Sequence, residues 1–137
     1  MNVGMIELGH TERLSIDCRI PVTVPKEEVV ARLAAAAAAY GLEYRQFDWL
    51  APLYLPLDHF MIRTLMGIYR DRSGDALSEP ISSGGATYAR AMPNCVAFGA
   101  LMPGEPITEH RPNERVALAN LYKAMEIYAH AVVALTR

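Results

Sequence analysis

The sequence has no large excess of charge, few cysteines and no long hydrophobic run. Its 13 basic and 15 acidic side chains give a net charge of −2, which offers no electrostatic basis for binding nucleic acid or an anionic membrane. Cys18 and Cys95 lie far apart without a C-x-x-C pair, so neither a disulfide framework nor a thiolate zinc site is expected. No apolar run approaches the ~20 residues of a membrane span. No basic-then-apolar leader opens the chain, and we expect a cytoplasmic protein.

What the chain does have is concentrated in residues 83–114. This stretch holds a glycine-rich turn, a short apolar run, a proline-bounded loop and one histidine, His110. The 137 residues, 52% of them hydrophobic, suffice for a modest core. The expected fold class is α/β, with α/β elements before this stretch and one closing helix after it.

The first 52 residues predict the order β-β-α-β. Residues 2–8 and 14–20 are strand candidates, the second because apolar and polar side chains alternate. Pro25 opens a helix with Thr23 or Val24 near its cap, and Gly41 ends it. Residues 42–50 then return as a strand.

Arg19 lies on the polar face of the second expected strand, beside Ser15 and Asp17. Its guanidinium can hold a carboxylate through two parallel hydrogen bonds. The alternative is a solvated arginine or one paired with an aspartate. The residues alone leave both interpretations open.

Residues 53–137 form the second expected part. After a proline-containing connector, Asp58 is positioned to cap a helix that Gly74 stops. Residues 78–82 predict a short strand. Apolar side chains recur with helical period over residues 118–135 and predict the closing helix.

Gly84 and Gly85 mark a turn, and Thr87 adds a hydroxyl beside it. Glycines allow positive φ and let a ligand approach the backbone closely, and exposed amides in such turns bind anions. A plain tight turn is the alternative. No Lys-Ser/Thr follows at the spacing of a phosphate loop.

His110 follows the apolar run 95–101, an expected strand. Gly104, Pro106 and Pro112 exclude a helix interior around it, so it lies on a loop. Loops at strand ends are where open α/β sheets place ligands, and an imidazole there can bind metal or transfer protons. The alternative is a solvated loop histidine, since one histidine is not a metal site.

Several segments resemble the dinuclear zinc dipeptidases, the PepV-type or Xaa-His dipeptidases related to carnosinase, aminoacylase and carboxypeptidase. The segments are, in order, NVGMIEL, LSIDCRIPV, YLPLDHFMIRTLMGIYRDRSGD, GGATYARAMPNCVAFGALMPGE, TEHRPNE and LYKAMEIYAHAV. The resemblance covers nearly the whole chain. The GG-T-YAR segment followed by H-x-x-NE is its most specific part.

The resemblance implies that residues 1–52 are the second half of an α+β lid, and residues 53–137 the end of an α/β zinc-exopeptidase catalytic domain. It implies that His110 binds a metal, with Asn113 and Glu114 bracing its loop. Arg19, Gly84, Gly85 and Thr87 would bind the substrate carboxylate. Ala86 stands where the family often has a third glycine.

In the family, two zinc ions share a water that attacks the peptide bond of a dipeptide. Cobalt or manganese are open alternatives. The family's H-x-D segment, Glu-Glu pair, further aspartate, glutamate base and lid histidine have no counterpart here. The fold is therefore expected to be incomplete and the chain inactive alone.

Two hypotheses follow from this departure. The chain is either the C-terminal piece of a zinc dipeptidase, complemented by an upstream catalytic half, or a non-catalytic module derived from the lid. A half-lid leaves unpaired strand edges, so homo-oligomerisation through lid strands is expected.

Overall fold

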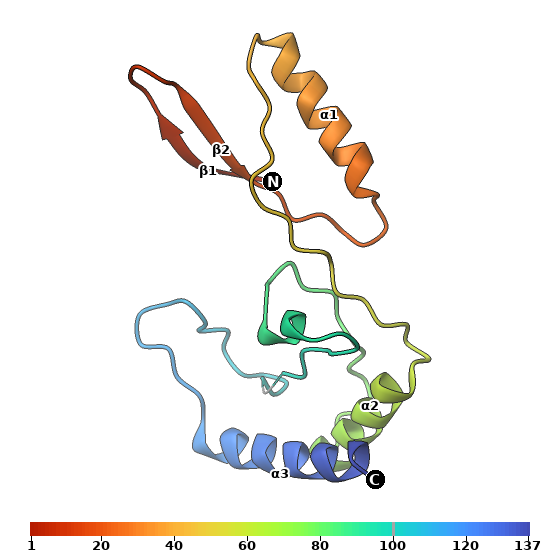
Figure 1. The fold of residues 1–137 in the computed structure, drawn as a ribbon. Helices are drawn as coiled ribbons and strands as arrows, with labels where there is room; N and C mark the ends of the chain where they lie inside the picture. Colours follow the sequence, from red (N-terminus) through yellow and green to blue (C-terminus); the bar gives the residue numbers. More distant parts are fainter. Residues whose placement is uncertain (100) are drawn as a thin grey trace. The chain divides into compact units, whose positions relative to one another are not determined.

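The computed structural model describes residues 1–99 and 101–137. The chain divides into two compact units, Met1–Tyr54 and Leu55–Arg137, each of which can be followed in Figure 1. The described residues form a mixture of α-helices and one small antiparallel sheet. The assignment of the two units to a lid and a catalytic domain stays a prediction.

The first unit begins with a hairpin of β1 (Asn2–Glu7) and β2 (Arg13–Asp17). The strands pair antiparallel, with Ile6 opposite Leu14 and a register irregularity between Val3 and Met5. Both predicted strands therefore form, although the second ends at Asp17 rather than at residue 20. Apolar side chains of β1 stay exposed, Ile6 at 63%.

Helix α1 (Lys26–Ala39) follows. Pro25 itself occupies the N-cap position without a side-chain hydrogen bond, so the predicted capping by Thr23 or Val24 is wrong. At the other end Gly41 adopts φ 69°, and the Gly41 and Leu42 amides donate to the Ala38 and Ala37 carbonyls. This is the Schellman arrangement that glycine favours, and it confirms Gly41 as the helix stop.

Three predicted strands are wrong. Residues 42–50 and 78–82 have no regular secondary structure, nor have the described residues of the run 95–101, in which Ala100 lies outside the described part of the chain. Their apolar composition suggested strands. A strand, however, needs a neighbour to pair its amide and carbonyl groups, and the only sheet among the described residues is β1–β2.

The second unit contains α2 (Phe60–Ser73), the short 3-10 helix η1 (Tyr88–Ala91) and α3 (Leu118–Leu135). His59, not the predicted Asp58, caps α2, because its Nδ1 accepts from the Met61 amide at 3.3 Å. Gly74 ends α2 at φ 74°, as predicted. The predicted bounds of α3 are confirmed. Within the described residues, no helix is long and apolar enough to span a membrane.

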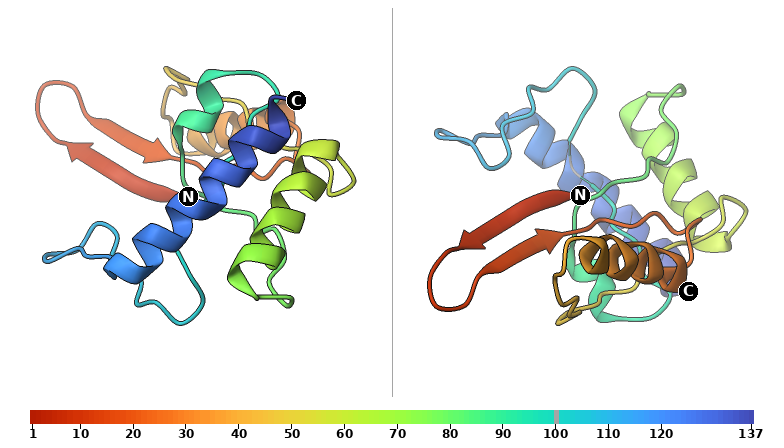
Figure 2. Two further views of the ribbon diagram at one scale, coloured as in Figure 1. Left: turned by 90° about the horizontal axis from the view of Figure 1, so that it is seen from below. Right: turned by 90° about the horizontal axis from the view of Figure 1, so that it is seen from above.

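Helices α2 and α3 pack side by side (Figure 2). Met102, Ala124 and Ile127 form the centre of a small core. Around it lie Ile68, Tyr69, Phe98 and Tyr128. The Tyr128 hydroxyl donates to the Phe98 carbonyl at 3.2 Å, and the two rings meet edge to face. This contact ties the segment before the His110 loop to α3.

Candidate functional site

The loop that carries His110 is closed at its neck by Thr108 and Arg115. The Thr108 hydroxyl donates to the Arg115 carbonyl at 3.1 Å, and Thr108 Oγ1 accepts in turn from the Arg115 amide at 3.3 Å. Inside the neck, the Arg111 amide donates to the Thr108 carbonyl at 3.2 Å and forms a turn. Residues 109–114 therefore project as a short loop from a fixed base.

Glu105 secures the base of this loop to the start of α3. Its carboxylate accepts from the Met102 amide at 3.1 Å and from the Ala117 amide at 3.3 Å. Ala117 is the N-cap residue of α3, where an anion also meets the positive end of the helix dipole. Hydrogen bonds from the Asn120 side chain, first, and from the Met102 and Ala117 backbone hold the pKa of Glu105 below its usual value.

His110 itself is exposed and has φ 60°. Asn113, in the same loop, has φ 63°. Left-handed backbone is uncommon for residues other than glycine, although histidine and asparagine are enriched there. Two such positions turn the chain sharply within the loop and leave the imidazole accessible to a ligand. Glu114 is also exposed. The predicted bracing by Asn113 and Glu114 stays a prediction.

The residues of this chain do not fit the metal centre that the family resemblance implies. Over residues 1–99 and 101–137 no group of three or more His, Cys, Asp or Glu side chains could hold a metal ion. A zinc ion needs three or four protein ligands, and His110 supplies one. A metal bound through His110 would therefore need more donors than the described residues gather around it.

Two polar groups at the glycine turn already have hydrogen-bond partners close in sequence. The Gly85 amide donates to Ser83 Oγ at 3.1 Å, and Thr87 Oγ1 accepts from the Ala89 amide at 3.2 Å as the cap of η1. Gly85 does not have a left-handed φ. Gly84, the other predicted carboxylate binder, adjoins this bond. The Gly85 amide and the Thr87 oxygen therefore have local partners in this conformation, and the predicted role of Gly84, Gly85 and Thr87 in binding a carboxylate stays a prediction.

Arg19 lies in the first unit, two residues beyond the end of β2, and is exposed. It is therefore not on the strand where the alternation placed it. His110 and the glycine turn belong to the second unit. The proposed role of Arg19 in binding a carboxylate stays a prediction.

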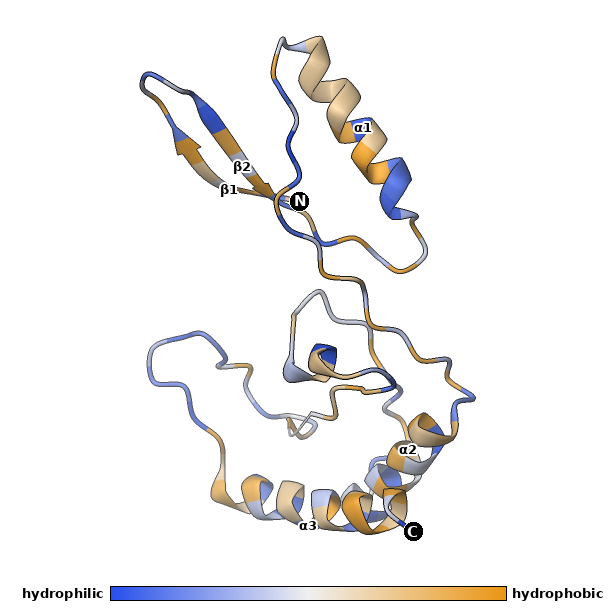
Figure 3. Cartoon of the chain, in the orientation of Figure 1, coloured by the Kyte–Doolittle hydropathy of each residue, from blue (hydrophilic) through white to orange (hydrophobic). Residues whose placement is uncertain are grey.

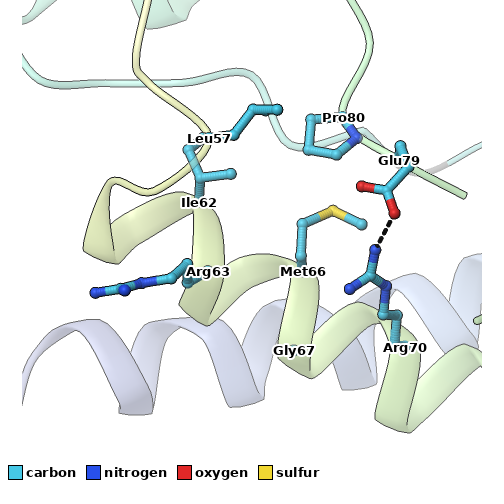
Figure 4. Close-up of a pocket in the computed structure, with 8 residues that line it drawn as sticks. All are labelled: Leu57, Ile62, Arg63, Met66, Gly67, Arg70, Glu79 and Pro80. Atoms are coloured by element: carbon cyan, nitrogen blue, oxygen red, sulfur yellow. Dashed lines mark hydrogen bonds and ion pairs between the residues drawn. The ribbon is translucent and has the colours of Figure 1, made fainter.

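A second feature of the same unit is a shallow pocket of about 220 Å3 beside α2. Figure 4 shows the Arg70 guanidinium at one side, bonded to Glu79 at 2.6 Å, with Met66 and Pro80 beside it. Arg70 Nε is buried without a hydrogen-bond partner. The Arg70–Glu79 pair fixes the segment that leads from α2 towards the glycine turn.

Asp75 fixes the start of that segment. Its carboxylate accepts from the Tyr69 hydroxyl at 2.7 Å and from the Leu77 and Ser78 amides at 3.0 and 3.1 Å. Hydrogen bonding, with Ser78 first and Tyr69 next, holds the pKa of Asp75 well below its usual range. Burial and then the Asp75 contact raise the pKa of Tyr69.

The sequence interpretation missed Glu105, Thr108 and Asp75 as organisers of these segments. The available signal was the position of Glu105 and Asp75 next to glycine or proline, together with the tendency of short side chains such as Asp and Thr to bond the nearby backbone. Pairings such as Thr108–Arg115 or Glu105–Ala117 span turns of irregular geometry, so residue spacing did not predict them.

The chain is similar in sequence to proteins named as dipeptidases. The chain is 32% identical over 136 residues to Putative dipeptidase SH1171 of Staphylococcus haemolyticus, covering 98% of this chain and 29% of that protein. It is 32% identical over 139 residues to Putative dipeptidase YtjP of Bacillus subtilis, covering 100% and 29%. A dipeptidase-named protein of Staphylococcus epidermidis is 30% identical over 136 residues, covering 98% and 29%.

The chain thus spans 29% of the length of the curated relatives it matches. No protein-family profile matches the sequence, and no solved structure matches it. The similarity includes both structural units and the His110 loop, because it covers 98–100% of this chain. It therefore connects the whole chain, not one motif, to proteins named as dipeptidases.

Proposed function

We propose that this chain is the C-terminal part of a metallodipeptidase, which hydrolyses dipeptides with a free C-terminal carboxylate. The observation that carries the proposal is the similarity of the entire chain to proteins named dipeptidase. The pinned loop that presents an exposed His110 supports it. The chain alone is expected to be inactive, because the described residues do not assemble a metal site.

His110 is proposed as a metal ligand contributed to a centre whose other donors lie outside this chain. Zinc is the metal that the resemblance implies, with cobalt or manganese as alternatives. Arg19, Gly84, Gly85 and Thr87 are proposed to contact the substrate carboxylate. The Gly85 amide would have to exchange its present bond to Ser83, whereas the Thr87 hydroxyl, whose oxygen accepts from the Ala89 amide, can still donate its own proton. A cytoplasmic location remains part of this proposal.

The test is a chimera of the Bacillus subtilis relative in which the matched stretch is replaced by these 137 residues. Hydrolysis of a dipeptide panel is measured with zinc, cobalt and manganese, beside the intact relative and the isolated chain. We expect activity in the chimera and none in the isolated chain. Turnover by the isolated chain, or a folded chimera that is inactive beside an active relative, contradicts the proposal.

The His110 assignment has a matched control in the same chain. His10 is exposed at the end of the β1–β2 hairpin, so His10→Ala removes an imidazole without touching the loop. In the chimera, His110→Ala should abolish activity and reduce bound metal, whereas His10→Ala should change neither. Equal activity of the two variants would contradict the assignment of His110 as a metal ligand.

The alternative function is a non-catalytic oligomerising module. Within the described residues β1–β2 is a two-stranded sheet, so each strand has one unpaired edge, and Val3 and Met5 on β1 are 52% and 54% exposed. Strand edges of this kind pair with other chains. An oligomer at low micromolar concentration without metal, lost in Met5→Pro, favours this alternative.

A further inference from the structure

Helix α3 is apolar on two opposite faces. One face, with Ala124 and Ile127 each 2% exposed and Ala131 at 6%, packs into the core of the second unit. At 100° per residue, Met125 points about 200° away from Ile127. It is about 100° from Ala124 and about 120° from Ala131. Met125 is 57% exposed, so an apolar side chain faces solvent away from the core.

The exposed apolar face runs the length of the helix. Its members lie within about 60° of one line at 3.6 residues per turn, and all are large and exposed: Leu118 67%, Leu121 40%, Tyr122 66%, Met125 57%, Val132 62% and Val133 46%. We call these six residues the outer stripe of α3. Figure 3 shows hydrophobic colour repeated along this helix.

The charged side chains of α3 all lie on one narrow flank between the two apolar faces. Lys123 bonds to Glu126 at 2.8 Å, and Glu126 also meets Arg72 of α2 at 3.8 Å. His130 is four residues after Glu126 and therefore shares that flank. The outer stripe contains no charged residue. A helix that is apolar almost all round is typical of a protein interior.

The part of the relatives that has no counterpart in this chain is available to cover the outer stripe. The matched relatives include a counterpart of the whole of this chain, yet that counterpart is 29% of their length. The buried core of the described residues is small and contains no large side chain below 2% exposure. A helix with an outer stripe this apolar fits a larger fold that continues on its far side.

We propose that the outer stripe of α3 is the docking surface for the remaining part of the dipeptidase fold. This rests on the proposed function, because it takes the missing part of the relatives as the occupant. The occupant presents a complementary apolar surface, and binding removes Met125 and its neighbours from water, which stabilises the complex.

The experiment uses the full 137-residue chain and a truncated Bacillus subtilis relative from which the matched stretch has been deleted. The relative's own deleted stretch, expressed separately, serves as the positive control. Binding is measured by titration calorimetry. Light scattering measures the mass of the chain alone and of its mixture with the truncated relative. We expect a one-to-one complex of this chain with the truncated relative.

Met125→Glu tests the surface, with Ala119→Glu as its matched control. Both substitutions are on exposed positions of α3 and add one negative charge, but Ala119 lies on the charged flank. The two variants therefore carry the same net charge and differ in the face of the helix that they alter. Burying an unpaired carboxylate is costly, so Met125→Glu should weaken binding by about tenfold or more. Ala119→Glu should leave affinity within about twofold.

Three results would overturn the inference. The first is no complex when the relative's own stretch binds, and the second is a complex that Met125→Glu leaves unchanged. The third is a self-associated chain that Met125→Glu makes monomeric, which assigns the stripe to a second copy. The binding measurement does not depend on hydrolysis of a dipeptide. A complex that hydrolyses no dipeptide therefore supports this surface while contradicting the proposed activity.

Discussion

Thr108 and Arg115 hold each other through a single hydroxyl group that both donates and accepts. Thr108 Oγ1 donates to the Arg115 carbonyl at 3.1 Å and accepts from the Arg115 amide at 3.3 Å. Because one oxygen satisfies both backbone groups of the same residue, the neck of the His110 loop depends on one side chain. The loop geometry should therefore be sensitive to a small change at position 108.

Thr108→Val keeps the shape of the side chain but removes the hydroxyl. Both hydrogen bonds of that hydroxyl, each worth ~1 kcal/mol, would be lost, and the Arg115 amide should exchange with solvent about 5–30-fold faster. Thr108→Ser should retain the protection. Thr136→Val is the control, since Thr136 Oγ1 bonds to the Val132 carbonyl at the end of α3. Unchanged Arg115 exchange in Thr108→Val would show that the neck is held by other contacts.

The helices and the hairpin were predictable from sequence, because their determinants are local. Leu118–Leu135 is set by apolar periodicity, and Gly41 and Gly74 end their helices through positive φ that glycine adopts readily. The strand predicted at residues 42–50 depended on a partner that local pattern does not supply. These residues form no strand, and within them the Arg45 side chain bonds to the Glu43 carboxylate at 2.8 Å.

The candidate site was predictable in part. Glycine and proline around His110 placed it on a loop, and the structure has it on an exposed turn. The contacts that hold that loop were not predictable, because they pair a side chain with distant backbone. Glu105 reaching the amide of Ala117, twelve positions away, is an example. Hydrogen bonds of this kind follow from the path of the chain rather than from a residue pattern.

Glu105 predicts how the loop base responds to acid. Its folded-state pKa lies below its ordinary value of 4.5 because the Asn120 side chain, first, and backbone amides stabilise the carboxylate. A depressed folded pKa gives stabilisation that is present above the unfolded pKa and lost as pH falls through the folded pKa. The Met102 and Ala117 amide resonances should therefore shift together with a midpoint below pH 4.5.

Glu105→Gln tests the origin of that transition. The amide side chain retains one oxygen acceptor but does not ionise, so the common titration of the Met102 and Ala117 resonances should disappear. A midpoint at or above pH 4.5, or a transition that persists in Glu105→Gln, would assign the pH response to another group.

Gly67 and Gly74 predict opposite effects of the same substitution. Gly67 is inside α2 and a Cβ there would meet no atom within 4 Å, so Gly67→Ala should stabilise the second unit by about 0.5–1 kcal/mol. Gly74 also has open space but holds φ 74°. Gly74→Ala should destabilise the unit by about 1 kcal/mol from backbone strain. Denaturant midpoints of the two variants measure this, and changes of the same sign would contradict the assigned end of α2.

The two apolar faces of α3 predict different costs for removing side-chain volume. Ile127 is 2% exposed and lies in the core with Met102 and Ala124, so Ile127→Ala should destabilise the chain by about 2–4 kcal/mol through lost burial and a cavity. Val132 on the outer stripe is 62% exposed, and Val132→Ala should change stability by less than about 0.5 kcal/mol. Urea unfolding of the isolated chain gives both values. Equal losses would mean that the outer stripe is already covered in the isolated chain. Repeating the measurement with the truncated relative bound should raise the cost at Val132 and leave the cost at Ile127 unchanged, because only the outer face gains a new neighbour.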